Sequence, residues 1–315
     1  MELVNELGPE FRISNEEFNR TFEELSNWGR WGEDDEFGTL NFLGEAEVAE
    51  AVKLAKTGRR VSLGRPLDTA PGPDNSRPAL HYMSHMGDPA PDEPTHYADF
   101  IGLDFHGKSA SHIDALPHIA YKGMFYNGKR ASNVVGSGGS SFAPISRLAD
   151  GVLARGVLLD VARARGVDWV EPPTALGAED LDAVASSLGV EVRRGDAVIV
   201  RSGQMRRRRV LGPWDPEQAG VGLVTSAMGW LAERQVAILG GDGDSDAHPS
   251  PVEGVGHPIH VLAIVAMGMC LLDNLDLERL SEACSAAGTF EFLLAVAPLI
   301  VPGGTGSPVN PIAVL

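Results

Sequence analysis

The sequence predicts a single α/β domain in which helices flank a mixed β-sheet core. Stretches with strand-like composition, such as residues 196–201 (DAVIVR) and 236–240, alternate with stretches of helical periodicity, such as residues 179–188 and 222–234. The 315 residues are 43% hydrophobic and 22% charged, which is ordinary for a globular protein. Because no internal repeat or low-complexity linker interrupts the chain, we expect one domain over residues 1–315.

The expected elements follow one another along the whole chain. Residues 1–45 form a helical, acidic lead-in that ends in an aromatic, glycine-rich turn around Trp28 and Trp31. Residues 70–95, rich in Pro, Gly and Asp, are the longest irregular stretch and a candidate lid over a substrate site. The remaining helices are expected at residues 45–56, 179–188, 222–234 and up to 284, and the strands at residues 60–67, 97–105, 151–161, 196–201, 236–240, 290–301 and the C-terminal end.

Composition excludes several classes of protein. No run of about eighteen apolar residues is present, so we expect no transmembrane helix and no membrane partner. The acidic N-terminal residues lack the basic-then-apolar order of a signal peptide. Cys270 and Cys284, both within apolar segments, do not suggest a disulfide framework. These features predict a cytoplasmic protein.

The net charge of −17 argues against nucleic acid as a partner, because phosphate backbones require a basic surface. The one basic run is MRRRR at residues 205–209. We expect it to be a solvated helix start or a subunit contact. A local anion site near the substrate is the alternative, and a nucleic-acid patch fits the overall charge least.

The candidate chemistry concentrates in residues 106–118, HGKSASHIDALPH. His112 and Asp114 are two residues apart, so on a strand they share a face about 7 Å apart and can converge on one cation. Imidazole with carboxylate suits zinc or manganese, with further ligands from elsewhere. His118 follows Pro117, which breaks any regular element. It could act as a ligand or as the general base beside a metal-bound water.

His106 presents a geometric problem in this segment. Six residues of straight strand would hold it about 20 Å from His112, too far for a shared metal. It can join the site only if residues 107–111 (GKSAS) fold back, and otherwise it is a capping or structural histidine. Outside the segment, His81 and His85 lie among prolines and are expected to be structural or surface residues.

A second cluster lies in the last third of the chain. His257 and His260 are followed by Asp273, and His260 at the start of an apolar helix could face the same cleft as Asp273 after the next strand. Upstream, the run GGDGDSD at residues 240–246 lacks the GxGxxG spacing of a dinucleotide loop and the glutamate of a calcium loop. We interpret it as a tight turn that presents a carboxylate to the pocket. No GxSxG motif supports a serine hydrolase.

These motifs resemble those of the putative cyclase family, whose best-known members are bacterial kynurenine formamidases and isatin hydrolases. The family signature H-x-x-x-H-x-D-x-x-x-H is similar to residues 111–118 (SHIDALPH) and their flanks. The resemblance continues through residues 257–280, at the start in RWGEDDEFGTLNFL and at the end in APLIVPGGTGSPVNPIAV. It is strongest to the longer members of roughly 300 residues, which have HGTAxTHxDAxxH followed by YNG, as at Tyr126–Gly128.

The resemblance implies a swivelling β/β/α fold, a homodimer or homotetramer, and one or two divalent metals in a cleft. By matching positions, it implies metal ligands at His112, Asp114, His260 and Asp273, the last of which is normally Glu. It also implies that activated water attacks an amide or lactam carbonyl of a small molecule, while His118 acts as acid and base.

One position departs from the family pattern. Four residues before His112 the family has its first ligating histidine, and this chain has Lys108, which cannot ligate while protonated. Three explanations are open: His106 substitutes through a bent loop, the site holds one metal with fewer ligands, or Lys108 replaces the charge of the metal.

These explanations lead to different functions. The first hypothesis is a metal-dependent hydrolase of a cyclic amide, lactone or N-formyl amide. The second is a metal-independent cyclase or lyase of a polyketide-like or aromatic biosynthetic pathway, in which Lys108 is catalytic and stabilises an enolate. A non-enzymatic binding module is the third.

Overall fold

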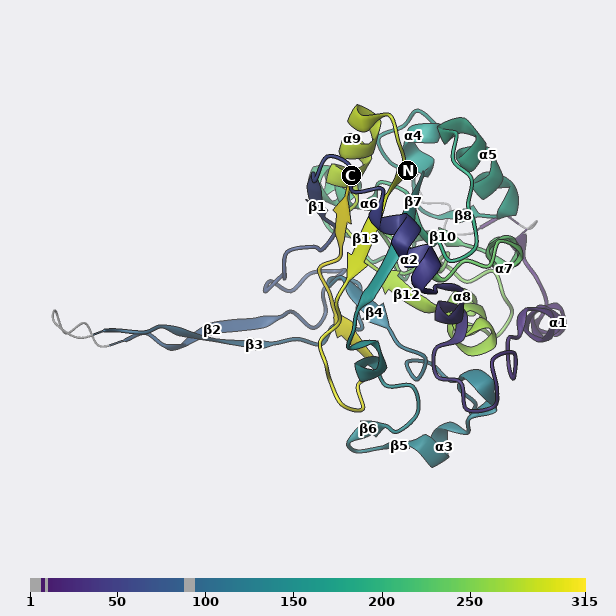
Figure 1. Cartoon of the computed structure of the whole chain (residues 1–315), viewed down its shortest axis with the longest axis horizontal. Coiled ribbons are helices and arrows are strands. Elements are labelled where there is room, and N and C mark those ends of the chain that lie inside the picture. The colour runs from purple at the N-terminus through teal and green to yellow at the C-terminus, as the bar shows by residue number, and fades with distance from the viewer. Residues whose placement is uncertain (1–6, 9–10, 88–93) are drawn as a thin grey trace.

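The computed structural model describes residues 7–8, 11–87 and 94–315, and its core is one mixed β-sheet (Figure 1). The strands of this sheet are β1 (Arg60–Ser62), β4 (His112–Asp114), β7 (Val152–Asp160), β9 (Ala197–Arg201), β11 (Ile238–Gly241), β12 (Cys270–Asp273), β13 (Glu291–Val296), β14 (Gly306–Pro308) and β15 (Ile312–Val314). Their spatial order is β1-β15-β13-β7-β9-β11-β12-β4-β14. The predicted α/β class with a mixed sheet is confirmed.

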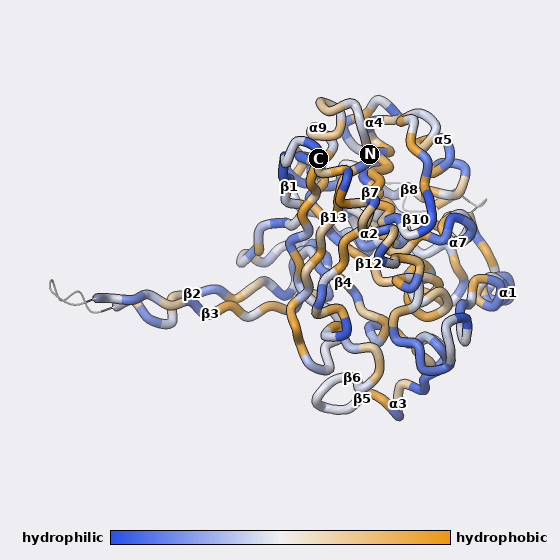
Figure 2. The backbone as a smooth tube through the Cα atoms, viewed as in Figure 1, coloured by the Kyte–Doolittle hydropathy of each residue, from blue (hydrophilic) through white to orange (hydrophobic). Residues whose placement is uncertain are grey.

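The centre of the sheet is parallel and its flanks are antiparallel. Strands β7, β9, β11 and β12 run parallel, whereas β13 joins β7 and β4 joins β12 in antiparallel register. Parallel strands covered on both faces are apolar throughout, which explains sequences such as AVIVR in β9 and CLLD in β12. Figure 2 shows hydrophobic residues following these central strands.

Helices cover the sheet. Helix α2 (Glu45–Val52) packs against β7 and β13, α5 (Ala178–Leu188) against β7, and α9 (Glu278–Ala287) against β1. The others are α1 (Asn15–Leu25), α3 (Ala131–Val134), α4 (Val161–Ala164), α6 (Gln204–Leu211), α7 (Thr225–Glu233), α8 (Pro258–His260), the 3₁₀ turns η2 (Gly38–Phe42), η3 (Tyr126–Gly128) and η4 (Ile145–Leu148), and the π-helical η5 (Val261–Met267). No helix in the described part of the chain is long and apolar enough to cross a membrane.

Two sequence-based expectations need correction. The helix predicted over residues 222–234 begins only at Thr225, because Val221–Leu223 forms β10 and pairs in parallel with β8 (Thr174–Leu176). The predicted irregular stretch 70–95 contains a strand, β2 (Leu80–His85), because β3 (Ala98–Gly102) pairs with it in an antiparallel ladder that is interrupted only by a register shift between Met83 and His85. The turn pair β5 (Val135–Gly136) and β6 (Gly139–Ser140) completes the strands.

Strands β2 and β3 form an arm that projects away from the body of the molecule (Figure 1). Its large apolar side chains are exposed, namely Leu80, Tyr82, Met83, Met86, Tyr97, Phe100 and Ile101. His81 and His85 are also exposed, as the sequence predicted. Residues 88–93 of the candidate lid lie outside the described residues.

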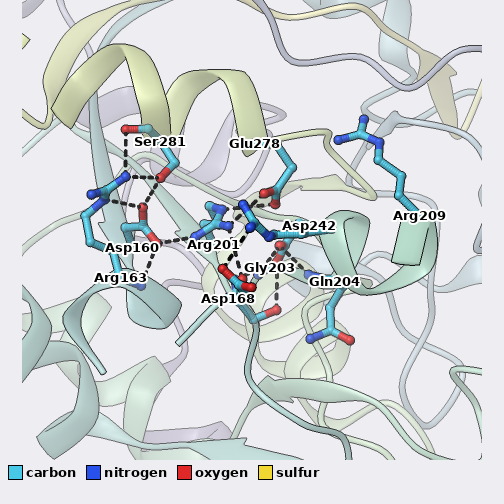
Figure 3. A network of polar contacts seen from close by, with 12 residues as sticks. Asp160, Arg163, Asp168, Arg201, Gly203, Gln204, Arg209, Asp242, Glu278 and Ser281 are labelled. Atoms are coloured by element: carbon cyan, nitrogen blue, oxygen red, sulfur yellow. Dashed lines mark hydrogen bonds and ion pairs between the residues drawn. The ribbon is translucent and has the colours of Figure 1, made fainter. Parts of the chain in front are cut away.

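A buried ion network fixes the ends of the central strands (Figure 3). The guanidinium of Arg201, the last residue of β9, donates to Asp160 Oδ1 at 2.6 Å and to both carboxylate oxygens of Glu278 at 3.0 and 2.8 Å. Burial raises the pKa of Glu278, while Arg201 opposes that shift. Next to this network, Asp242 accepts hydrogen bonds from the backbone of residues 202–204, which anchors the turn after β11.

The basic run 205–209 is part of α6, and each of its arginines pairs with an acidic residue. Arg206 contacts Asp168 and Arg207 contacts Glu171. The remaining two arginines bind the acids Asp68, Asp74 and Asp276. The ion pairs of this run therefore connect α6 to loops of the same chain.

Substituting Arg201→Ala is expected to lower the free energy of unfolding by about 3–5 kcal/mol, because Glu278 would stay buried without its counter-charge and Asp160 would keep only its ion pair with Arg163. The measurement is urea denaturation followed by circular dichroism. Arg193→Ala is the matched control, since its pair with Glu191 is exposed and surface pairs contribute about 0–1 kcal/mol. Equal losses in the two variants would contradict the assignment.

Candidate metal centre

Strand β4 brings the predicted pair to the middle of the molecule. Its neighbours are β12 on one side and β14 on the other, so that Asp273 lies directly across from His112 in the ladder. Asp114 is fully buried and His112 nearly so. As the spacing of two predicted, the pair shares a face, with His112 Nε2 3.5 Å from Asp114 Oδ1.

His106 joins this site because the loop before β4 folds back. Its Nδ1 lies 2.8 Å from Asp114 Oδ1, and its ring is 5.5 Å from that of His112 between centroids. Its other nitrogen, Nε2, is held 3.1 Å from the hydroxyl of Thr305. The separation of about 20 Å that a straight strand would impose does not arise, because residues 107–111 do not continue as a strand. The bent-loop explanation for His106 therefore matches the observed geometry.

His260 approaches the same carboxylate from the other side. It ends α8, and its Nε2 lies 3.6 Å from Asp114 Oδ2 and 3.3 Å from Asp273 Oδ2. Its Nδ1 is held 2.6 Å from Asp246 Oδ2. Asp246 also accepts hydrogen bonds from the backbone nitrogens of Ile259 and His260, so one carboxylate fixes both the helix start and the ring.

Three imidazoles around Asp114 are held in the same way. In each, one ring nitrogen is anchored, to Ala110 O for His112, to Thr305 for His106 and to Asp246 for His260. The other nitrogen is directed at the Asp114 carboxylate. An anchored ring with one free nitrogen is the usual second-sphere arrangement of metal-binding histidine.

Several buried atoms at the centre have no hydrogen-bond partner among the residues that the structure describes. They are both carboxylate oxygens of Asp114, Oδ2 of Asp273 and Nδ1 of His106. Leaving buried acceptors unpaired is costly, and a divalent cation would satisfy them together. The ligand atoms of His106, His112 and Asp114 lie within 4.8 Å of one another, as do those of Asp114, His118 and His260. The donor set of nitrogen and carboxylate oxygen fits zinc or manganese.

The electrostatics of the centre also favour a cation. Burial opposes ionisation of Asp114, yet His112 and the other surrounding imidazoles hold the pKa of that carboxyl well below its ordinary value. Burial likewise opposes protonation of His260, but Asp114, Asp246 and Asp273 hold its pKa well above the usual range. Three buried carboxylates around one imidazole thus create a site that needs positive charge.

His118 differs from the other histidines of the site. Its ring stacks on that of His106 at 4.1 Å between centroids, and Nδ1 lies 3.8 Å from Asp114 Oδ1. Burial lowers the pKa of His118 to about 4, which the Asp114 carboxylate only partly opposes. The ring is therefore neutral at pH 7 and able to accept a proton. It also lines the pocket, where it can contact a bound molecule.

The metal-ligand candidates open onto a pocket of about 440 Å³. Its walls are mostly polar and include Pro73–Arg77, which precede β2 in the chain. Ile119 is one of its few apolar residues. A pocket of this size and character fits a small polar molecule.

Lys108 faces a different part of this pocket. Its ammonium forms ion pairs with Asp244 and, at 3.1 Å, with Glu217. Asp244 is the pocket-facing carboxylate predicted for the GGDGDSD turn. His257, the other predicted histidine, stands between this group and His260, 5.7 Å from the latter ring.

Some residues of the site were missed by sequence reasoning. Asp246 was seen only as one of three aspartates, and His248, Glu217 and Thr305 were not singled out. The spacing of four between Asp244 and His248 was the available signal, because it brings His248 Nε2 within 3.1 Å of Asp244 Oδ2. Nothing local marks Thr305, which is 199 residues from His106.

Residues 61–245 match the model of the family described as putative cyclase. The chain belongs to that family. A solved structure described as a novel cyclase superimposes with a TM-score of 0.79 at 28% identity, covering 93% of this chain and 99% of its own.

More distant structures share the fold. An isatin hydrolase bound to the product analogue thioisatinate has a TM-score of 0.57 at 19% identity, over 86% of this chain and 97% of its own. Isatin hydrolase A from Ralstonia solanacearum has a TM-score of 0.56 at 21% identity, covering 84% of this chain and 95% of its own. A structure described as a potential metal-dependent hydrolase with cyclase activity has a TM-score of 0.51 at 16% identity, covering 81% of this chain and 96% of its own. A comparison with curated protein sequences gave no significant match.

Substituting Thr305→Val is expected to weaken zinc or manganese binding about 10-fold or more, because His106 loses the hydroxyl that orients its ring. Competition with a chromophoric chelator measures the affinity. Thr21→Val in α1 serves as the control, since its hydroxyl bonds only within its own helix. Unchanged affinity in Thr305→Val would show that His106 is not a ligand.

Proposed function

We propose that this protein is a metal-dependent hydrolase of a small cyclic amide, lactone or N-formyl amide. The observation that carries the proposal is the buried Asp114 carboxylate, which lacks hydrogen-bond partners among the described residues and is surrounded by free imidazole nitrogens. The fold shared with isatin hydrolases and with a metal-dependent hydrolase supports the same reaction class.

Each residue has a defined part in this proposal. His106, His112, Asp114 and His260 would hold zinc or manganese, with Asp273 supporting His260. A divalent metal in such a site supplies Lewis acidity, which lowers the pKa of water to about 7. His118, neutral at pH 7, would take the proton from the attacking water and pass it to the leaving nitrogen or oxygen.

The second candidate, a metal-independent cyclase or lyase, would use Lys108 to stabilise an enolate and His118 with Asp114 as the acid and base. The position of Lys108 in the pocket favours it. However, Asp244 and Glu217 compensate the ammonium charge, which weakens its field at a substrate oxygen. Lys108 also leaves the carboxylate of Asp114 uncompensated. Hydrolysis therefore fits the site better.

Removing the metal with a chelator is expected to abolish hydrolysis, and added Zn²⁺ or Mn²⁺ should restore it. The assay follows a panel of cyclic amides including isatin, aryl lactones and N-formyl anilides. Full activity of a preparation with no divalent metal by mass spectrometry would exclude the hydrolase mechanism and favour the alternative.

His118→Ala is expected to lower kcat by about 10²–10⁴-fold while the metal content stays unchanged, because the variant loses proton transfer but keeps the anchored ligands. His81→Ala on the exposed arm is the control and should retain full activity. Loss of metal together with activity in His118→Ala would instead make His118 a ligand.

We further propose that two copies of the chain associate through the β2–β3 arm. A two-stranded ribbon is only marginally stable in water by itself, and this one exposes seven large apolar side chains. A symmetric second copy would cover them without any other partner. The buried free thiols of Cys270 and Cys284 are consistent with a reducing, cytoplasmic location for this assembly.

The triple variant Leu80→Ser, Tyr97→Ser and Ile101→Ser should shift the molar mass in light scattering from an oligomer to a single chain. The control is Val210→Ser with Leu211→Ser, since these side chains are equally exposed but lie in α6, away from the arm. A wild-type protein that is a single chain at micromolar concentration would disprove the association.

A further inference from the structure

Beside the candidate metal centre lies a second group of ligand-type side chains, formed by Asp244, His248 and His257. One ligand atom from each falls within 4.8 Å of the others. Asp244 and His248 are buried, and the ring of His257 is half-buried at the pocket wall. None of the three anchors a ligand of the first centre through a hydrogen bond in the described chain, although His257 also lies within ligand distance of Asp246 and His260.

A cation of the chain itself already occupies this group. The ammonium of Lys108 contacts Asp244 Oδ2, which is also 3.1 Å from His248 Nε2, and it contacts Glu217 Oε1 at 3.1 Å. The side chain of Lys108 is largely buried, with 18% exposed. The loop that carries His106 to the first centre therefore carries Lys108 to the second.

The neighbouring groups respond to this charge. Burial lowers the pKa of His248, and the Lys108 ammonium lowers it further. Burial opposes ionisation of Glu217, but Lys108 holds the pKa of that carboxyl below its ordinary value. The pKa shift of His248 favours the neutral form that metal binding requires, and Asp244 supplies a carboxylate.

We propose that Asp244, His248 and His257 form a second divalent-cation site that the Lys108 ammonium fills, so that this enzyme works with one metal fewer than the side chains around its pocket could hold. An ammonium and a divalent ion cannot share one carboxylate oxygen, because both require its lone pairs and their charges repel. Two imidazoles and one carboxylate, with water as the fourth ligand, complete a site for zinc. The inference rests on the proposed function only for the metal in the first centre.

The site explains the departure of Lys108 from the family pattern in a new way. Lys108 does not replace the missing ligand beside Asp114, because His106 occupies that position. Instead it supplies a fixed positive charge on the wall of the same pocket, one imidazole ring away from His260. The charge near the substrate is then built into the chain and does not depend on the supply of a second ion.

The test counts bound metal in each protein. Purified protein is stripped with chelator, incubated with excess Zn²⁺ or Mn²⁺, desalted and measured by mass spectrometry against protein concentration. We expect Lys108→Ala and Lys108→Gln to bind one more ion per chain than the wild type. Lys53→Ala, which removes an exposed lysine of the surface, should leave the count unchanged.

The double variant Lys108→Ala with His248→Ala should return to the wild-type count, because it removes one of three ligands. A spectrum with Co²⁺ gives a second readout, since the extra ion in Lys108→Ala should add absorption that the double variant lacks. Folding of each variant is checked by circular dichroism.

An equal count in wild type and in both folded Lys108 variants would overturn the inference. So would an extra ion that remains after His248→Ala. The wild-type count separately tests the proposed function: a wild type that binds no metal contradicts the hydrolase, whereas the difference of one ion between variant and wild type still decides the role of Lys108.

Discussion

The structure of this site depends on one buried carboxylate that the protein does not satisfy by itself. Asp114 ends the short strand β4 and is fully buried, and neither of its oxygens has a hydrogen-bond partner in the described chain. A fold tolerates such a group only when something compensates its charge. The imidazoles of His106, His112 and His260 are each fixed at one nitrogen and direct the other toward Asp114, so with Asp114 they would hold a divalent cation.

The scaffold around this carboxylate explains the position of each candidate ligand. Antiparallel pairing of β4 with β12 sets Asp273 opposite His112, and pairing with β14 brings the segment of Thr305 to His106. Each of the three aspartates after β11 binds a different group. Asp242 caps the turn into α6, Asp244 binds Lys108, and Asp246 orients His260. One short turn thus connects the buried ion network of Arg201 to the pocket.

Much of the fold could be predicted because it follows from local chemistry. Short apolar runs such as AVIVR in β9 favour strands buried on both faces, and the spacing of His112 and Asp114 gives them a shared face on any strand. The arm could not be predicted, since Leu80–His85 becomes a strand only through its partner β3, and its apolar residues are not buried in the described chain. Similarly, the predicted start of α7 was wrong because Val221–Leu223 pairs with β8 and forms a strand.

The sequence by itself predicted which side chains form the candidate site, through the spacing of His112 and Asp114 and through the resemblance at the positions of His260 and Asp273. It placed His112, Asp114, His118, His260 and Asp273 in one site, and the structure brings them together. Only the tertiary structure decided the positions of His106 and Lys108, which stand two residues apart in the same loop. A fold-back of that loop sends the imidazole to Asp114 and the ammonium to Asp244. Side chains on an irregular backbone have no fixed period, so their directions are set by distant partners such as Thr305 and Glu217.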